Sequence, residues 1–407
     1  MSATAALSGT LRLPGRIHFG FGARHQLGEL IAPFGSRVLA VVDPFLLTTP
    51  AVRETLDALR DSRIVLQVVS DVQPELPVDT LDAASQAAGR FAPDAVLAIG
   101  GGSALDAAKA IALLAAHGGP LDRYYGENAV PGPVVPIIAL PTTAGTGSEA
   151  TPVAVVSDPE RELKVGISSP YLIPAAALVD PELTIGAPPS VTAHSGIDAL
   201  VHAVESYTAR PIEAEWSGML PVFTGRNALA SPLALDAVER LGRWLPVAVA
   251  DGADREAREQ VALASLLAGM AFGPTGTHLS HALQYPVGAL TKTPHGLGTG
   301  LLLPYVLEAV SGDAGTRERL ARVAGALGAE PSAEAAIHAL VALNRRIGLP
   351  ASLAEIGVEP EQLPRIAELG MRSTRLVGIA PVAADSGLLL EILRRAHAGS
   401  LSDALPA

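Results

Sequence analysis

The residues best suited to chemistry are a carboxylate and several histidines in the second half of the sequence. Asp198 and His202 are four residues apart, which on a helix places both side chains on one face, within reach of one cation. His278, His281 and His295 follow, in a chain with 10 histidines. Three neutral imidazoles and one carboxylate suit Fe(II) or Zn(II) rather than Mg(II) or Ca(II). A surface Asp-x-x-x-His pair is the alternative, and His278 is interpreted as a core histidine.

A glycine-rich loop in the first half is suited to binding phosphate. Residues 95–99 have a strand pattern, three glycines follow at 100–102, and a helical pattern begins at Ser103. Glycines at a strand-to-helix junction let backbone N–H groups approach a pyrophosphate, and the helix N-terminus adds partial positive charge. A flexible turn is the alternative, but the position directly after a buried strand favours a nucleotide site.

Two further features of the first half point to a dinucleotide. The loop 141–149, Pro-Thr-Thr-Ala-Gly-Thr-Gly-Ser-Glu, offers N–H and O–H donors, with a solvated Thr/Ser loop as the alternative. Neither a Walker loop nor the Rossmann Gly-x-Gly-x-x-Gly motif is present. Asp43 ends the first strong strand pattern, where a carboxylate accepts hydrogen bonds from a ribose and favours NAD over NADP. A turn aspartate before Pro44 is the other interpretation.

The elements that must position these residues change in type along the chain. Strand patterns at 38–42, 64–69, 95–99, 134–140 and 176–179 alternate with helical patterns at 50–60, 79–90 and 103–116, which predicts βαβ units and a parallel sheet. After the Gly-Ala-Pro-Pro segment at 186–189, long Ala/Leu-rich helical patterns continue to the C-terminus. Residues 209–232 contain prolines and glycines and are expected to form a long loop beside the cleft.

The composition limits the protein class. A chain of 407 residues with 49% hydrophobic and 17% charged residues is expected to form two globular domains. Its formal charge of −12 disfavours nucleic acid and anionic membranes as partners. The absence of cysteine excludes disulfides and thiolate ligands. No signal peptide or membrane-spanning segment is expected, so the prediction is a cytoplasmic enzyme.

These motifs together resemble the iron-containing (group III) alcohol dehydrogenase family. GGGSALDAAKA resembles its first phosphate loop, and PTTAGTGSE resembles its second nucleotide loop. Residues 178–205 follow its first signature, and HALQYPVGALTKTPHG follows its second, with the fourteen-residue step from His281 to His295. Residues 344–357 resemble its C-terminal helical region, so the resemblance extends over residues 15–395.

The resemblance implies a fold and a set of site residues. It implies a dehydroquinate synthase-like architecture, with an α/β parallel-sheet dinucleotide-binding domain at 1–186 and an all-α catalytic domain at 187–407. The implied cofactors are NAD and Fe(II), with Zn(II) as the alternative metal, and the implied reaction is hydride transfer between a small alcohol or aldehyde and NAD(H) in a homodimer or larger assembly. The implied metal ligands are Asp198, His202, His281 and His295, with Tyr285 beside them in the catalytic site; the implied cofactor residues are Asp43, Gly101, Gly102, Ser103, Asp106, Thr142, Thr143, Thr146 and Lys164.

Two departures from the family pattern concern the substrate. Many members carry a further histidine four residues after the third ligand, where this chain has Tyr285. A similar Tyr-Pro pair occurs in the hydroxyacid–oxoacid transhydrogenase branch, so such an enzyme with a retained cofactor is the main alternative. The loop at 209–232 also differs from commoner members. A dehydroquinate-synthase-like lyase and a non-catalytic binding protein are the remaining alternatives.

Overall fold

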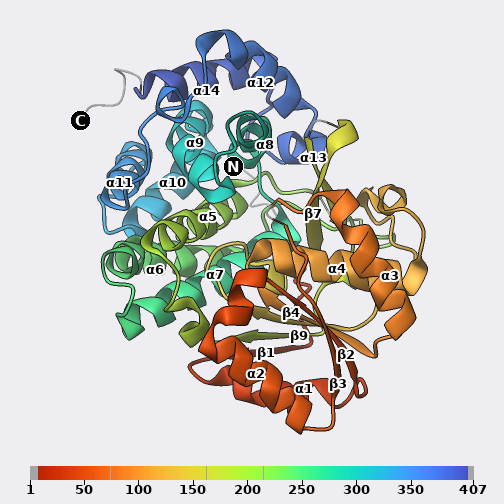
Figure 1. Cartoon of the computed structure of the whole chain (residues 1–407). Coiled ribbons are helices and arrows are strands. Elements are labelled where there is room, and N and C mark those ends of the chain that lie inside the picture. Colours follow the sequence, from red (N-terminus) through yellow and green to blue (C-terminus); the bar gives the residue numbers. More distant parts are fainter. Residues whose placement is uncertain (1–7, 74, 162, 214, 402–407) are drawn as a thin grey trace. The chain divides into compact units, whose positions relative to one another are not determined.

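The computed structural model describes residues 8–401 except residues 74, 162 and 214 (Figure 1). The chain forms two compact units that are each discontinuous in sequence. The sheet unit consists of Arg12–Ala187 and Ala253–Gly269. The helical unit contains the described residues of three ranges, namely 8–11, 188–252 and 270–401.

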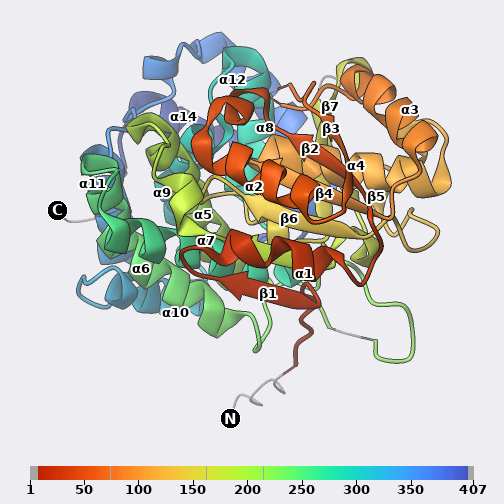
Figure 2. The same ribbon diagram turned by 60° about the horizontal axis from the view of Figure 1, so that its bottom comes forward.

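The sheet unit is built on six parallel strands in the order β1-β9-β6-β4-β2-β3 (Figure 2). The strands are β1 (Arg16–Phe19), β2 (Arg37–Val42), β3 (Val65–Val69), β4 (Ala95–Gly100), β6 (Ile137–Pro141) and β9 (Ala176–Val179). The strand order reverses between β2 and β4, because β3 lies on one side of β2 and β4 returns to the other. In open α/β sheets, ligands bind at the carboxyl ends of the strands at such a reversal.

The alternating side chains of the strands face two separate cores. Leu39, Val41 and Val96 pack with helices α3 (Leu81–Phe91) and α4 (Gly102–His117). Their neighbours in the strands pack with α1 (Leu27–Ile31) and α2 (Pro50–Asp61) on the other face. A parallel sheet covered on both faces requires strands that are apolar throughout, and every residue of β4 is buried. This arrangement confirms the predicted α/β fold class.

A second, smaller sheet lies at one side of the sheet unit and was not predicted. It joins β5 (Gly126–Glu127), β8 (Leu163–Ser168) and β7 (Val153–Asp158), with β7 and β8 antiparallel. Helix α4 holds β7 in place through two polar side chains. Lys109 Nζ donates to the carbonyl oxygens of Thr151 (2.9 Å) and Val153 (2.8 Å), and Asp106 accepts the N–H of Val155 (2.9 Å). The α4 helix is therefore fixed at both the main sheet and the smaller one.

The helical unit confirms the prediction that the second half of the chain is mostly helical. Its helices are α5 (Pro189–Thr208), α6 (Ser231–Ala250), the end of α7 (Arg255–Thr275), α8 (Leu279–Thr291), α9 (His295–Val310), α10 (Ala314–Ala326), α11 (Ala333–Arg346), α12 (Leu363–Met371), α13 (Thr374–Gly378) and α14 (Ser386–Ala398). Helix α5 is buried all around from residue 196 to residue 208, which is the pattern of a central core helix. None of the helices within the described ranges is long and apolar enough to cross a membrane.

Three boundaries differ from the sequence-based expectation for physical reasons. The strand expected at 134–140 begins at Ile137, because Pro136 has no N–H to donate to a sheet ladder. The expected loop at 209–232 ends at residue 230, because Pro232 occupies the first turn of α6, where proline is tolerated. The sequence segment Thr-Pro-His-Gly at 293–296 is typical of a turn, but in the structure His295 is the first residue of α9.

Candidate metal centre and cofactor loops

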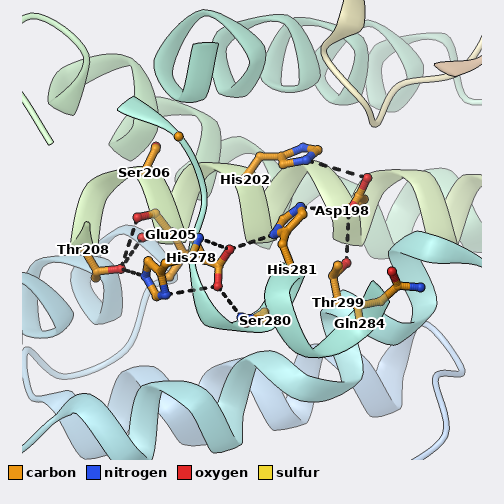
Figure 3. A network of polar contacts seen from close by, with 12 residues as sticks. Asp198, His202, Glu205, Ser206, Thr208, His278, Ser280, His281, Gln284 and Thr299 are labelled. Carbon is orange, nitrogen blue, oxygen red and sulfur yellow. Dashed lines mark hydrogen bonds and ion pairs between the residues drawn. The ribbon is translucent and has the colours of Figure 1, made fainter. Parts of the chain in front are cut away.

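Three helices of the helical unit bring together the four candidate metal ligands. Asp198 and His202 project from the middle of α5, one helical turn apart. His281 lies near the start of α8, and His295 begins α9. The three helices pack against one another, since α9 contacts both α5 and α8. Residues from distant parts of the sequence therefore meet beside the buried helix α5, and Figure 3 shows His281 next to Asp198 and His202.

Three of the four candidates place their ligand atoms close enough together to bind one ion. Asp198, His202 and His281 are buried, and each offers one ligand atom within 4.8 Å of the other two. The carboxylate of Asp198 lies 3.9 Å from Nε2 of His202 and of His281, and 3.8 Å from Nε2 of His295. Such separations are expected of atoms that surround a metal at about 2.0–2.2 Å each. The side chain of His295 is the most exposed of the four, at 26%.

Ring packing fixes the orientation of the imidazoles. His202 stacks on Phe272 with ring centroids 4.1 Å apart and on His281 with centroids 4.9 Å apart. His295 meets His281 edge-on at 5.3 Å. Tyr285 stacks on the ring of His295 at 5.9 Å, so the tyrosine that departs from the family pattern lies beside the metal candidates.

The surroundings of Asp198 favour an ionised carboxylate. Burial raises the pKa of Asp198, but the three histidines and the hydroxyl of Thr299, which donates to Asp198 Oδ1 at 2.9 Å, hold it below its ordinary value. Nε2 of His281 is buried and has no hydrogen-bond partner among the described residues. An unpartnered buried nitrogen that faces a carboxylate and a second imidazole fits a metal ion, because a cation would supply the missing partner.

Behind these ligands lies a buried carboxylate whose role sequence reasoning missed. Glu205 is fully buried and accepts hydrogen bonds from the N–H groups of His278 (2.8 Å) and Ser280 (2.7 Å) and from Nδ1 of His281 (2.7 Å) (Figure 3). Burial raises its pKa, but His278 and these hydrogen bonds outweigh burial and lower the pKa to about 2. The available sequence signals were its place one turn after His202 and its position at the end of the first family signature.

The remaining histidine of the cluster has a structural role. His278 precedes α8, and burial lowers its pKa. Its Nδ1 lies 3.2 Å from Glu205, and its Nε2 shares a hydrogen bond of 2.9 Å with the hydroxyl of Thr208. The interpretation of His278 as a core residue agrees with these contacts.

The two candidate cofactor loops of the sheet unit lie against each other at two glycines, where a side chain on the first loop would press on the second. A Cβ on Gly101 would lie 3.3 Å from Oγ1 of Thr143, and a Cβ on Gly102 would lie 2.6 Å from Cγ2 of Thr146. Thr142 joins the loops directly, because its N–H donates to the carbonyl of Gly100 at 3.0 Å. Gly102 and Ser103 are the first residues of helix α4, so the N-terminus of this helix lies where the two loops meet. Backbone this close to an open helix end suits a pyrophosphate.

Three other cofactor candidates differ in their surroundings. Asp43 follows β2 and accepts the N–H of Phe45 at 2.9 Å, and a Cβ on Gly100 would lie 3.4 Å from its Cβ. Asp43 therefore lies at the strand-order reversal, and its side chain also stabilises the turn that follows β2. Asp106 accepts hydrogen bonds from the Ser148 hydroxyl (2.7 Å) and from Val155, and so it positions the second loop from behind. Lys164 lies on β8, outside both loops, and forms an ion pair with Glu75.

The site and the fold define a metal-dependent nicotinamide oxidoreductase. Residues 14–181 match the family model of iron-containing alcohol dehydrogenases, and residues 192–397 match the C-terminal model of the same family. The chain therefore belongs to the iron-containing alcohol dehydrogenase family. As such it is an NAD-linked, iron-type oxidoreductase that interconverts alcohols and aldehydes, as the sequence resemblance predicted.

Characterised relatives cover nearly the whole chain. The NAD-dependent methanol dehydrogenase of Bacillus methanolicus is 37% identical over 362 residues, which are 86% of this chain and 90% of the relative. The lactaldehyde reductase of Escherichia coli is 33% identical over 364 residues, 87% of this chain and 90% of the relative. The crystal structure of a 1,3-propanediol oxidoreductase superposes with a TM-score of 0.88 at 32% identity, covering 96% of this chain and all of the other.

Proposed function

We propose that Asp198, His202, His281 and His295 hold one Fe(II) ion and that the substrate is a short alcohol or its aldehyde. The observation that carries this proposal is the convergence of three buried ligand atoms within 4.8 Å, one of them the unpartnered Nε2 of His281. Zn(II) would fit the same nitrogen and oxygen donors. The methanol dehydrogenase and lactaldehyde reductase relatives support small substrates.

Each group of side chains has a task in this reaction. A bound metal supplies Lewis acidity to the alcohol oxygen, which makes the alcohol easier to deprotonate. Oxidation then removes one hydride, which NAD accepts, and one proton. Asp198 offsets the charge of the cation, and the three imidazoles stay neutral so that their nitrogens remain free to bind. We propose that Tyr285, stacked on the ring of His295, borders the alcohol and helps to select it.

We propose further that the loops around Gly101, Gly102, Ser103, Thr142, Thr143 and Thr146 bind the NAD pyrophosphate and that Asp43 binds the adenosine ribose. The support is the glycine cradle of the two loops and the position of Asp43 at the strand-order reversal. Asp106 would support the second loop through its hydrogen bond to Ser148, and Lys164 would contribute to cofactor binding from β8. The family resemblance also supports a homodimer or larger assembly in the cytoplasm, with residues 1–186 and 187–407 as the cofactor-binding and catalytic domains.

Metal analysis and turnover assays test the proposed centre. Anaerobically purified protein would be stripped, reloaded with Fe(II) or Zn(II), and assayed with NADH and NADPH against short alcohols, diols, hydroxy acids and aldehydes. We expect one metal per chain, metal-dependent turnover and a preference for NADH. Asp198→Ala should abolish both metal binding and turnover.

Asp236→Ala is the matched control. Asp236 also pairs with a residue four positions later, Arg240, but the pair lies on the exposed face of helix α6. The control variant should leave metal binding and turnover unchanged. If Asp198→Ala turned over at the parental rate after metal removal, the proposed centre would be refuted. If metal bound but no free cofactor were ever consumed, the transhydrogenase alternative would replace the dehydrogenase.

A further inference from the structure

One carboxylate ties the candidate ligand His281 to the central helix. Glu205 lies one helical turn beyond His202 on α5, with both side-chain oxygens buried. Its Oε2 accepts from Nδ1 of His281 (2.7 Å) and from the N–H of His278 (2.8 Å). Its Oε1 accepts from the N–H of Ser280 (2.7 Å). Two helices that meet at the metal candidates are thus joined through a single side chain (Figure 3).

The number of donors around Glu205 requires a carboxylate rather than an amide. Three N–H groups point at its two oxygens, and Nδ1 of His278 lies 3.2 Å from Oε1. A glutamine has only one acceptor oxygen, so its amide N–H₂ would face at least one of these donors. A buried donor left without an acceptor costs about 1–3 kcal/mol. Position 205 therefore requires a side chain with two acceptor oxygens.

The contact between Glu205 and His281 decides which ring nitrogen is available to a cation. A neutral imidazole carries one proton, and the nitrogen that keeps it is set by the hydrogen bond it donates. Because a carboxylate can only accept, Nδ1 of His281 must carry the proton. The lone pair then lies on Nε2, which is the atom 3.9 Å from Asp198 and without a partner among the described residues.

A second ligand candidate is oriented in the same way by a neutral group. Nδ1 of His295 is hydrogen-bonded to Oε1 of Gln284 at 2.5 Å, which leaves its Nε2 facing Asp198. The two imidazoles therefore present the same nitrogen, one backed by a carboxylate and the other by an amide. A carboxylate partner raises the basicity of the imidazole more than an amide does.

We propose that Glu205 is the positioning residue of the metal centre, which holds His281 in its Nδ1–H tautomer with Nε2 aimed at the ion before the metal arrives. This inference rests on the proposed metal ligands. It assigns to Glu205 a role in metal affinity that is separate from its role in joining α5 to the start of α8.

Metal affinity and tautomer state test the proposal. Chelator competition with Zn(II) and Co(II) should give a 10- to 100-fold weaker affinity for Glu205→Gln than for the parent chain. The Co(II) absorption spectrum should change in position or intensity, because one of its nitrogen ligands is no longer held in place. Circular dichroism and thermal unfolding of the metal-free variant establish that it is folded. Unchanged affinity and spectrum in the folded variant would overturn the proposal.

Asp313→Ala is the matched control for the structural part of the effect. Asp313 also accepts two hydrogen bonds at the start of a helix in this unit, from the N–H and the hydroxyl of Thr316, but it contacts no candidate ligand. Loss of this helix cap in the alanine variant should lower thermal stability, by about 0.5–2 kcal/mol, without changing metal affinity. A loss of affinity in this control as large as in Glu205→Gln would assign the effect to folding and overturn the proposal.

A measurement on the parent chain keeps the proposal testable even if Glu205→Gln does not fold. In the metal-free protein, long-range ¹H–¹⁵N spectra of the histidine rings, assigned with His281→Ala, should show His281 protonated at Nδ1. Protonation at Nε2 would overturn the inference. If His281→Ala and Asp198→Ala bound metal as the parent does, the metal ligands themselves would be wrong; if both lost metal while Glu205→Gln did not, only the role of Glu205 would fail.

Discussion

Replacing Gly102 with alanine should both weaken NAD binding and destabilise the fold. The new Cβ would lie 2.6 Å from Cγ2 and 3.2 Å from Cβ of Thr146. Carbon atoms prefer about 3.5–4.0 Å, so the second loop must retreat by roughly 1 Å. Overpacking of this kind costs about 1–3 kcal/mol of stability. The methyl and the displaced threonine both crowd the first N–H groups of α4, so we expect the NADH dissociation constant to rise at least ~10-fold, about 1.4 kcal/mol.

NADH fluorescence titration and thermal unfolding separate the two effects. Gly89→Ala is the matched control, because a Cβ on this glycine of α3 meets no atom within 4 Å. It should keep the parental NADH affinity and gain up to about 1 kcal/mol of stability. Adding Thr146→Ser to Gly102→Ala removes the Cγ2 that collides and keeps the hydroxyl, so stability should recover while NADH affinity stays low. Parental NADH affinity in a folded Gly102→Ala variant would refute the assignment of this loop to the cofactor.

Two further predictions concern the buried charges beside the cofactor loops. Lys109→Met should destabilise the protein by about 3 kcal/mol, because the carbonyls of Thr151 and Val153 lose their buried donor; an unchanged urea midpoint would contradict this. Burial raises the pKa of Glu149 from 4.5 to about 7, so the folded protein retains a proton there that the unfolded chain has already released, and stability falls as the pH rises from 4.5 to 7. Glu149→Gln should therefore be more stable than the parent at pH 8, by up to about 3 kcal/mol, and equal to it near pH 4.5; thermal unfolding at both pH values measures the difference.

Local patterns in the sequence were enough to predict the elements that carry the cofactor loops. The strand at 95–99, its three glycines and the following helix appear as β4 and α4 within one residue at each end. Strand and helix here are set by neighbouring residues, namely a continuous apolar run, a glycine turn and an alanine-rich helix. The alternation of strands and helices likewise determined a parallel sheet, since each strand returns through a helix.

The features that sequence patterns did not predict depend on contacts between distant segments. Strand β1 has only four residues, Arg16–Phe19, and exists because it pairs with β9, more than 150 residues later. Residues Ala253–Gly269 join the sheet unit although they lie in the helical half of the sequence. Arg258 makes one of the contacts that hold them there, by donating to the carbonyl of Ala187 at 3.2 Å. No local periodicity indicates such pairings.

The candidate metal site shows the same division between local and distant information. The spacing of Asp198 and His202 on one helix is local, and it was apparent from the sequence. The contribution of Glu205 depends on His278, Ser280 and His281, more than 70 residues away, and no spacing indicates it. The same holds for Thr299, which donates to Asp198 across 101 residues.

Helix α5 explains why the fold and the site depend on each other. A helix buried on all sides cannot carry ionised groups unless each one finds partners, because an unpaired buried charge costs several kcal/mol. Asp198 finds Thr299 and three imidazoles, and Glu205 finds the start of α8. The Nε2 atom of His281 is left over, and a cation is the partner whose chemistry matches it. The buried carboxylates of α5 thus find their partners only when the helices meet as they do here, and the metal that we propose would bind the remaining Nε2 atom on α8.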